Sequence, residues 1–411
     1  METILTCCAG LDVHKESIEA CVRRMEPTGR LHQQTRHWAT MTADLLAMAE
    51  WMSAQGVTHV AMESTGVYWK PIYNILEGRF TVLVVNAHHL KQVPGRKSDV
   101  RDCQWIAQLL QHGLLKGSFI PPRPQREWRD LTRHRTQLIE EKTRTVNRLH
   151  KILEDANIKL ASVATDLLGV SGRAILERLI EGEDDPVKLA EFAQGQLRGK
   201  IPQLQKALQG HVTEHHQFML ELLWKQLAQL EEVIAQLEAR IEDKTRPFEE
   251  VLERLDAVPG VDRRVAEVVL AEVGPDTTPF PSDQNLASWA GMCPGNEESA
   301  GKRRRRRITP GNRWLKRSLV QAAWAASHTK NTYLASQYRR LACRRGKKRA
   351  LIAVGHSLLV IYYHMLERDI PYAELGGDFL DRLEPDRLKR YHVRRLEKLG
   401  YRVTLETGTA A

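Results

Sequence analysis

The chain has 411 residues, enough for two or three domains that each bury a core of their own. Its formal net charge is +10 and its sequence pI is about 9.3, which favours a polyanionic partner. Hydrophobic residues make up 42% of the chain, which excludes a disordered basic tail.

Strands and helices alternate over the first 120 residues. Apolar or alternating runs predict strands at 4–11, 17–23, 58–62 and 80–85. Helical spacing predicts helices at 42–55, 68–76 and 99–115, the last with Ser98 as its cap. Three prolines, at 121, 122 and 124, close the segment. We therefore expect an α/β domain over residues 1–125, built on a mixed sheet covered by helices.

The remainder is expected to be helical. A long polar helix is predicted over 127–157, and a seam of leucine and isoleucine over 220–241 alternates spacings of three and four. Such a seam predicts a coiled coil or a helical hairpin, with its partner helix in the same chain or in a second copy. We expect a helical, coiled-coil segment over 126–250 and a mostly helical domain over 251–411.

The stretch 255–275 has a turn at Pro259-Gly260 followed by a helical pattern. One interpretation is a helix-hairpin-helix whose turn amides hold a DNA phosphate. The other is a plain pair of packed helices. Asp262 stands where a second glycine is usual, which weakens the first interpretation.

Basic charge is concentrated in one segment. Residues 301–366 contain 17 Lys or Arg and no Asp or Glu. Because a solvated surface usually mixes both signs, this segment indicates binding to phosphate backbones, without separating DNA from RNA. The candidate contacts are Lys302, Arg303, Arg304, Arg305, Arg306, Arg307, Arg313, Lys316 and Arg317.

Four acids in the first domain follow predicted strands or begin a predicted helix. Asp12 lies in GLDVHK, Glu63 in MESTG, and Asp99 and Asp102 in KSDVRD. Any one of them alone fits a cap or a surface position. Together they would repel one another unless a cation lay between them. Two Mg²⁺ ions held by carboxylate oxygens would remove the repulsion and create a phosphoryl-transfer site.

These motifs resemble the DEDD motif of the insertion-sequence one-ten transposases. The second domain is also similar to that family, in PGV at 259–261, FPSDQNLASWAGMCPGNEES at 280–299 and ITPGNRWLKRSL at 308–319. The resemblance implies a ribonuclease-H-like, Holliday-junction-resolvase-type first domain whose metal ligands are Asp12, Glu63, Asp99 and Asp102. It also implies a nucleophilic serine five residues after Pro294, which is Ser299. Ala300 follows it where the family often has glycine.

The resemblance further implies an RNA-guided recombinase with Mg²⁺ as its cofactor. Its partners would be target and donor DNA and a structured non-coding bridge RNA, and its assembly a dimer or a tetramer. The first domain has acids but no evident nucleophile, and the second has Ser299 but no carboxylate from 299 to 366, so we expect a composite site. Two alternatives are a metal-dependent junction-resolving endonuclease with a structural Ser299, and a non-catalytic nucleic-acid-binding protein.

The cysteines and the apolar stretches indicate where the protein works. The six cysteines show no C-x-x-C pair and no metal-ligand spacing, which fits a reducing compartment. The N-terminus has no apolar signal core, and the apolar run 351–365 is short for a bilayer. We expect a soluble, cytoplasmic protein without a membrane partner.

Overall fold

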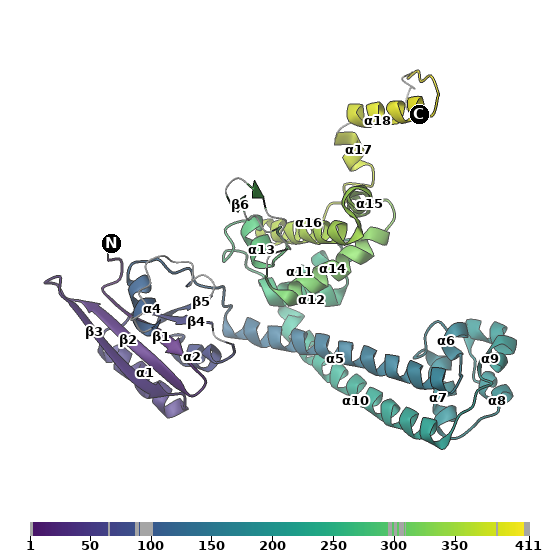
Figure 1. Ribbon diagram of the computed structural model, residues 1–411, viewed down its shortest axis with the longest axis horizontal. Coiled ribbons are helices and arrows are strands. Elements are labelled where there is room, and N and C mark those ends of the chain that lie inside the picture. The colour runs from purple at the N-terminus through teal and green to yellow at the C-terminus, as the bar shows by residue number, and fades with distance from the viewer. Residues whose placement is uncertain are drawn as a thin grey trace. The chain divides into compact units, whose positions relative to one another are not determined.

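A computed structural model describes residues 3–64, 66–86, 90, 102–294, 298–299, 302–303, 308, 310–383 and 385–406. The predicted site residues Asp99 and Arg304 to Arg307 lie outside these ranges, as does the predicted cap Ser98. For Ser299, Lys302 and Arg303 the structure describes the backbone alone. The chain divides into two compact units, residues 1–121 and 122–411 (Figure 1).

The first unit is built on a mixed sheet, as the sequence predicted, with five strands where four were expected. Its strands are β1 (Cys7–Val13), β2 (Ser17–Met25), β3 (Leu31–Ala39), β4 (His59–Glu63) and β5 (Thr81–Val85). Their order is β3-β2-β1-β4-β5. Strands β1, β4 and β5 run parallel, whereas β2 and β3 add as antiparallel neighbours of β1 and β2 respectively.

Strand β3 was not predicted. Its sequence, LHQQTRHWA, is largely polar, and most of its residues are exposed or half-buried. It is the outermost strand of the sheet, paired with β2 on one side. An edge strand of this kind is held by its backbone ladder rather than by apolar side chains, so it has no alternating hydrophobic pattern.

Helices cover both faces of the sheet. On one face, α1 (Thr42–Ala54) and α2 (Trp69–Leu76) pack on a core that includes Leu11, Ile18 and Met62. On the other, α4 (Asp102–Gln111) packs on a smaller core with Cys8 and Ala61. The alternation of Leu11 and Cys8 between the two cores follows from the two-residue period of a strand.

Helix α4 lies in direct contact with the backbone of β1. A Cβ atom added at Gly10 would lie 2.3 Å from the carbonyl oxygen of Cys103 and 2.4 Å from the backbone nitrogen of Ala107. Only glycine permits this approach, because both contacted atoms belong to the helix backbone and cannot rotate away. Gly10 therefore sets how closely the start of α4 approaches the end of β1.

The second unit is helical. A hairpin of two long helices, α5 (Arg123–Asp155) and α10 (Glu214–Thr245), runs side by side (Figure 1). On α10, Leu220, Leu223, Leu227, Ile234 and Ile241 are buried. The predicted seam thus packs within the chain, and the contact with a second copy stays a prediction. At the far end of this hairpin is a small cluster of α6 (Leu160–Val163), α7 (Val170–Ile180), α8 (Pro186–Glu191), a 3-10 turn η1 (Gly195–Lys200) and α9 (Ile201–Ala207).

The rest of this unit is a group of shorter elements. They are a 3-10 turn η2 (Arg246–Phe248), α11 (Glu249–Asp256), α12 (Arg263–Val273), α13 (Asp283–Trp289), a two-stranded ladder of β6 (Glu298–Ser299) and β7 (Lys302–Arg303), α14 (Arg313–His328), α15 (Tyr333–Arg345), α16 (Lys347–Arg368), α17 (Phe379–Leu383) and α18 (Pro385–Lys398). Helix α16 extends the apolar run 351–365 and is long and apolar enough to cross a membrane by length and composition. Leu358, Leu359 and Tyr362 of α16 are buried within the second unit.

The turn between α11 and α12 packs against α14. Gly260 has a φ of +85°, and a Cβ added there would lie 2.3 Å from the backbone nitrogen of Ala326. The carboxylate of Asp262 caps α12 by accepting a hydrogen bond from the Val265 backbone N–H at 2.9 Å. A carboxylate at this helix start would repel a phosphate, so these contacts favour the packed-helix interpretation of 255–275.

We predict that Gly10→Ala destabilises the first unit. Because the added methyl group meets helix backbone, α4 must move, and overpacking of this kind costs about 1–3 kcal/mol. Chemical denaturation would measure the loss. Gly117→Ala is a matched control, because its nearest contact would be the Leu83 Cγ at 3.6 Å, an ordinary van der Waals distance. Equal stability of the two variants would contradict the close packing of α4 on β1.

Candidate active site

Two of the predicted acids end neighbouring parallel strands. Leu11 of β1 is paired with Met62 of β4, so Asp12 and Glu63 are the next residues of the two strands at the same edge of the sheet. Asp12 is also paired with Glu19 across the antiparallel ladder with β2. The strand adjacency that the sequence prediction required is therefore present.

Asp102 is brought toward Asp12 by the close contact of α4 with Gly10. Asp102 lies in the first turn of α4, and its charge acts on Asp12. Burial raises the pKa of Asp12 most strongly, and the charges of Asp102 and Glu19 raise it further. The imidazole of His14 opposes them, with its Nε2 atom 3.3 Å from the Asp12 Oδ2 atom.

At this sheet edge the pKa of the Asp12 carboxyl is raised, first by burial and then by the charges of Asp102 and Glu19. That is the environment that a hard divalent cation such as Mg²⁺ would relieve. Within the described residues, no group of three or more His, Cys, Asp or Glu side chains is close enough to hold a metal ion. Asp99, the fourth predicted ligand, lies outside those residues.

The predicted nucleophile lies in a short β-ladder. Ser299 of β6 is paired with Lys302 of β7, and Ala300 and Gly301 separate the two. This places the backbone of a serine beside that of the first residue of the basic run 302–307. We call residues 293–309 the serine segment.

The two ends of the serine segment are held together. Pro294 and Ile308 form an antiparallel bridge, and the Asn312 backbone N–H donates to the Trp289 carbonyl at 3.3 Å. A Cβ added at Gly311 would lie 2.3 Å from the backbone nitrogen of Gly291, so the chain entering the segment touches the chain leaving it. We call residues 289–292 and 310–314 the two stems.

The other predicted nucleic-acid contacts lie at the start of α14. Arg313 is exposed, with its guanidinium 4.6 Å from the ring centroid of Trp314. Arg317 is exposed but forms an ion pair with Glu140 of α5. In the same acid-free segment, the turn between α15 and α16 carries five exposed cations, namely Arg344, Arg345, Lys347, Lys348 and Arg349.

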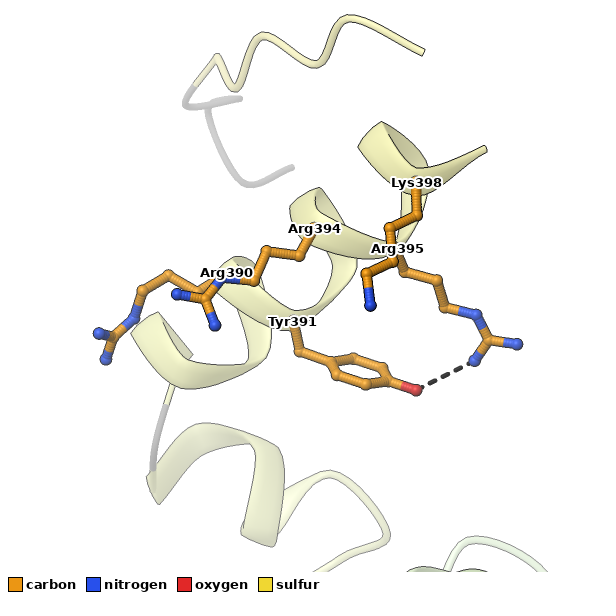
Figure 2. A pocket seen from close by; sticks show the side chains of 5 residues that line it. All are labelled: Arg390, Tyr391, Arg394, Arg395 and Lys398. Carbon is orange, nitrogen blue, oxygen red and sulfur yellow. Dashed lines mark hydrogen bonds between the residues drawn. The ribbon is translucent and has the colours of Figure 1, made fainter. Parts of the chain in front are cut away.

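A further basic surface was missed from the sequence. On α18, the side chains of Arg390, Tyr391, Arg394, Arg395 and Lys398 line one pocket (Figure 2), and the Arg395 guanidinium donates to the Tyr391 hydroxyl at 3.0 Å. The recurrence of cations at 390, 394 and 398 could have indicated this surface, because residues four apart share a helix face. Acidic residues at 386 and 397 mask it in a simple count of charge.

Comparison with known proteins matches parts of both units to transposase family models. Residues 9–158 match a DEDD family model of IS110 that is described as a transposase, and residues 252–339 match one described as the transposase IS116/IS110/IS902 family. The four predicted acids fall in the first match and Ser299 in the second. The chain belongs to the IS110 family of transposases.

A curated relative comes from Streptomyces coelicolor, where it is named the insertion element IS110 uncharacterized 43.6 kDa protein. It is 32% identical over 114 residues, which cover 27% of this chain. The match spans 28% of the length of that relative.

We predict that Asp12→Asn stabilises the protein in Mg²⁺-free buffer at pH 7. The raised pKa means that the folded state holds this proton more tightly than the unfolded chain, so ionisation at neutral pH lowers the free energy of unfolding. The amide removes that cost. The advantage should vanish below the ordinary aspartate pKa of about 3.9, where the carboxyl is protonated in both states.

Thermal unfolding at pH 7 and pH 3 would measure this difference. Glu16→Gln, an exposed position in the turn between β1 and β2, is the control for loss of one negative charge. An Asp12→Asn variant no more stable than this control at pH 7 would contradict the electrostatic interpretation of the sheet edge.

Proposed function

We propose that this chain is an RNA-guided DNA transposase that cuts and rejoins DNA through a covalent phosphoserine intermediate. The observation that carries the proposal is the edge of the first sheet. There Asp12 and Glu63 end adjacent parallel strands, and the charge of Asp102 acts on Asp12. We assign the first domain to the ribonuclease-H-like fold on the basis of this arrangement and of the family match. The same proposal divides the chain into three domains, with boundaries after residues 125 and 250.

Asp12, Glu63, Asp99 and Asp102 would hold Mg²⁺, which, when bound, would stabilise the charge that develops on a scissile phosphate. The carboxylates themselves would keep the metal at the sheet edge. Asp12, half-buried and surrounded by like charge, would bind most favourably when its own proton has left.

Ser299 would supply the nucleophile. Its Oγ atom gives up its proton and attacks the phosphorus atom, and the bond from phosphorus to one deoxyribose oxygen breaks. That oxygen takes up a proton and leaves as a hydroxyl, so no net proton is gained or lost. The DNA end is then esterified to the serine. Attack by a hydroxyl of another DNA end reverses the sequence, re-forms a phosphodiester and frees Ser299. Energy of the original bond is thus conserved through cutting and joining.

The cations of the second unit would neutralise the phosphates of DNA and of a structured bridge RNA. The basic run 302–307 adjoins the serine. The turn between α15 and α16 and the basic face of α18 offer additional cations. Sequence choice would rest on base pairing with the RNA, while the protein holds backbone and shape. We place the protein in the cytoplasm, as a homo-oligomer that joins two DNA duplexes.

We predict that Ser299→Ala abolishes a covalent protein–DNA adduct that the wild-type protein forms with Mg²⁺ and cognate nucleic acids. The adduct should survive denaturation and disappear on proteolysis. Asp102→Asn should also abolish it, because an amide does not supply the carboxylate charge. Denaturing electrophoresis of labelled DNA would measure both. An adduct formed by Ser299→Ala would overturn the nucleophile, and cleavage by that variant without an adduct would favour the junction-resolving endonuclease.

Mixing the two variants tests whether acids and serine come from different subunits. Each variant retains the part that the other lacks, so a trans arrangement should restore some strand exchange. Strand exchange that stays absent in the mixture would contradict the trans arrangement alone.

We predict that replacing the five arginines 303–307 by alanine weakens the salt dependence of nucleic-acid binding. Each phosphate contact contributes about −0.9 to the slope of log affinity against log salt on duplex DNA, so the slope should become less negative by up to about 4.5. Fluorescence anisotropy between low and physiological salt would measure it. An unchanged slope would mean that the five arginines do not contact phosphates and belong to a solvated loop.

A further inference from the structure

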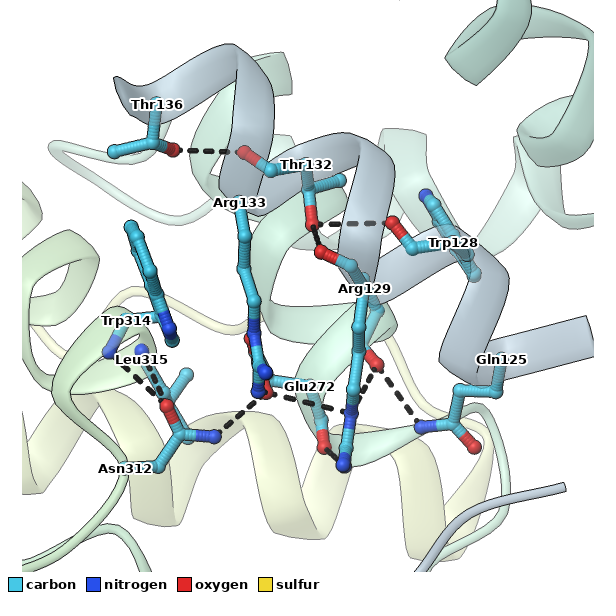
Figure 3. A network of polar contacts seen from close by, with 11 residues as sticks. Gln125, Trp128, Arg129, Thr132, Arg133, Thr136, Glu272, Asn312, Trp314 and Leu315 are labelled. Atoms are coloured by element: carbon cyan, nitrogen blue, oxygen red, sulfur yellow. Dashed lines mark hydrogen bonds and ion pairs between the residues drawn. The ribbon is translucent and has the colours of Figure 1, made fainter. Parts of the chain in front are cut away.

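A buried polar network connects α5 to α12 and to the second stem of the serine segment (Figure 3). At its centre is Glu272, near the end of α12, whose side chain is fully buried. Arg133 of α5 pairs with it through two hydrogen bonds, Nε to Oε1 at 2.6 Å and a terminal nitrogen to Oε2 at 2.7 Å. A buried carboxylate of this kind is stable only while its partners stay in place.

Arg129 adds a second cation from the next turn of α5. Its Nε atom donates to the carbonyl of Ala271 at 3.0 Å, and it also donates to the carbonyl of Glu272. These are carbonyls of the last turn of α12, which lack partners within the helix. Burial lowers the pKa of Arg129 to about 10, still well above neutral, so its charge is retained.

The same two arginines contact one tryptophan from each stem. The Arg129 guanidinium lies 5.6 Å from the ring centroid of Trp289, at the end of α13. The Arg133 guanidinium lies 5.9 Å from that of Trp314, at the start of α14. Each contact is within the range of a cation–π interaction. The arginine pair thus contacts both stems, one where α13 ends and the other where α14 begins.

Asn312 connects the centre of the network to the second stem. Its Nδ2 atom donates to the Oε2 atom of Glu272 at 2.6 Å. Its Oδ1 atom accepts hydrogen bonds from the backbone N–H groups of Trp314 and Leu315, at 3.0 and 3.2 Å, and so caps α14. One side chain therefore joins the buried carboxylate to the helix that begins where the serine segment ends.

We propose that Glu272 and Asn312 are positioning residues for the serine nucleophile: they hold the stems of the serine segment so that Ser299 meets a scissile phosphate. The inference rests on the proposed function, because it concerns how the proposed nucleophile is placed. Neither residue needs to touch DNA. Loss of the link between them would leave Ser299 in the chain and its basic neighbours intact but misdirected.

The decisive variant is Asn312→Asp. The introduced carboxylate keeps an oxygen to cap α14, but places a second oxygen against Glu272 where an amide donor was. A misplacement of about 1 Å at a reacting group costs about a hundredfold in rate, so adduct formation should fall by about that factor. Binding of DNA and RNA should stay near the wild-type value.

A polarity swap provides the rescue. In Glu272→Gln combined with Asn312→Asp, the new amide can donate to the new carboxylate. This restores the hydrogen bond to residue 312 and the negative charge of the network, while the Arg133 terminal nitrogen loses the Oε2 acceptor. Adduct formation should recover at least about tenfold over Asn312→Asp alone. Because a merely structural defect would lower nucleic-acid binding and adduct formation together, the recovery is measured as adduct formed at equal DNA binding.

Glu267→Gln is the matched control. Glu267 is also buried on α12 and pairs with an arginine of α5, with the Arg135 terminal nitrogen 2.6 Å from its Oε2 atom. It also pairs with Arg263 rather than with a stem. This variant should lose thermal stability yet keep the adduct yield of the folded protein. Asn312→Ser is a second test variant, because serine keeps a capping oxygen and adds no charge.

Limited trypsin digestion gives a readout independent of activity. Cleavage at Lys302 to Arg307, located by mass spectrometry, should be faster in Asn312→Asp and Asn312→Ser than in Glu267→Gln, and slower again after the polarity swap. Folded Asn312 variants with wild-type adduct yield and wild-type cleavage rate would overturn the inference. A wild-type protein that forms no adduct would overturn the proposed function, and the trypsin rates would then still decide whether the stems are held by Asn312.

Discussion

The buried carboxylate of Glu272 is the constraint on which the organisation of the second unit depends. It is fully buried and contacts groups from α5 and α14 while belonging to α12. An unpaired charge in that position would be severely destabilising, so the three helices have to meet in one arrangement. Apolar packing alone tolerates sliding of one helix along another. Directed hydrogen bonds from Arg133 and Asn312 do not, because their geometry fixes register as well as proximity.

The first unit relies on a different constraint. In that unit α4 can pack directly against the backbone of β1 because Gly10 has no side chain. Near this contact, burial first and the charges of Asp102 and Glu19 second raise the pKa of Asp12, so its ionisation carries a cost to folding. A cost of that kind is typical of a binding site, since the group that would relieve it is a ligand and not another part of the protein.

Much of this could be predicted from the sequence because the signals were local. Apolar runs located β1, β2, β4 and β5, and the end of a strand located Asp12 and Glu63. Strand β3 escaped because an edge strand needs no hydrophobic alternation. The network around Glu272 was not predicted for another reason. Arg129 and Asn312 lie 183 positions apart in the chain, and the local sequence around either residue gives no indication of the other. A buried glutamate inside an amphipathic helix looks like any solvated one until its partners are placed.

The hairpin of α5 and α10 has a consequence for spacing within the second unit. Helix α5 is continuous from Arg129 and Arg133, which contact the stems, to the cluster of α6 to α9 at its far end. Each residue of such a helix adds about 1.5 Å of length. The number of residues in the two long helices therefore sets the separation between the stems and that cluster. Because their seam repeats about every seven residues, lengthening or shortening both helices by seven would change the reach by about 10 Å while the leucines stayed in phase. The hairpin is thus a spacer whose length can differ between sequences only in steps of about seven residues.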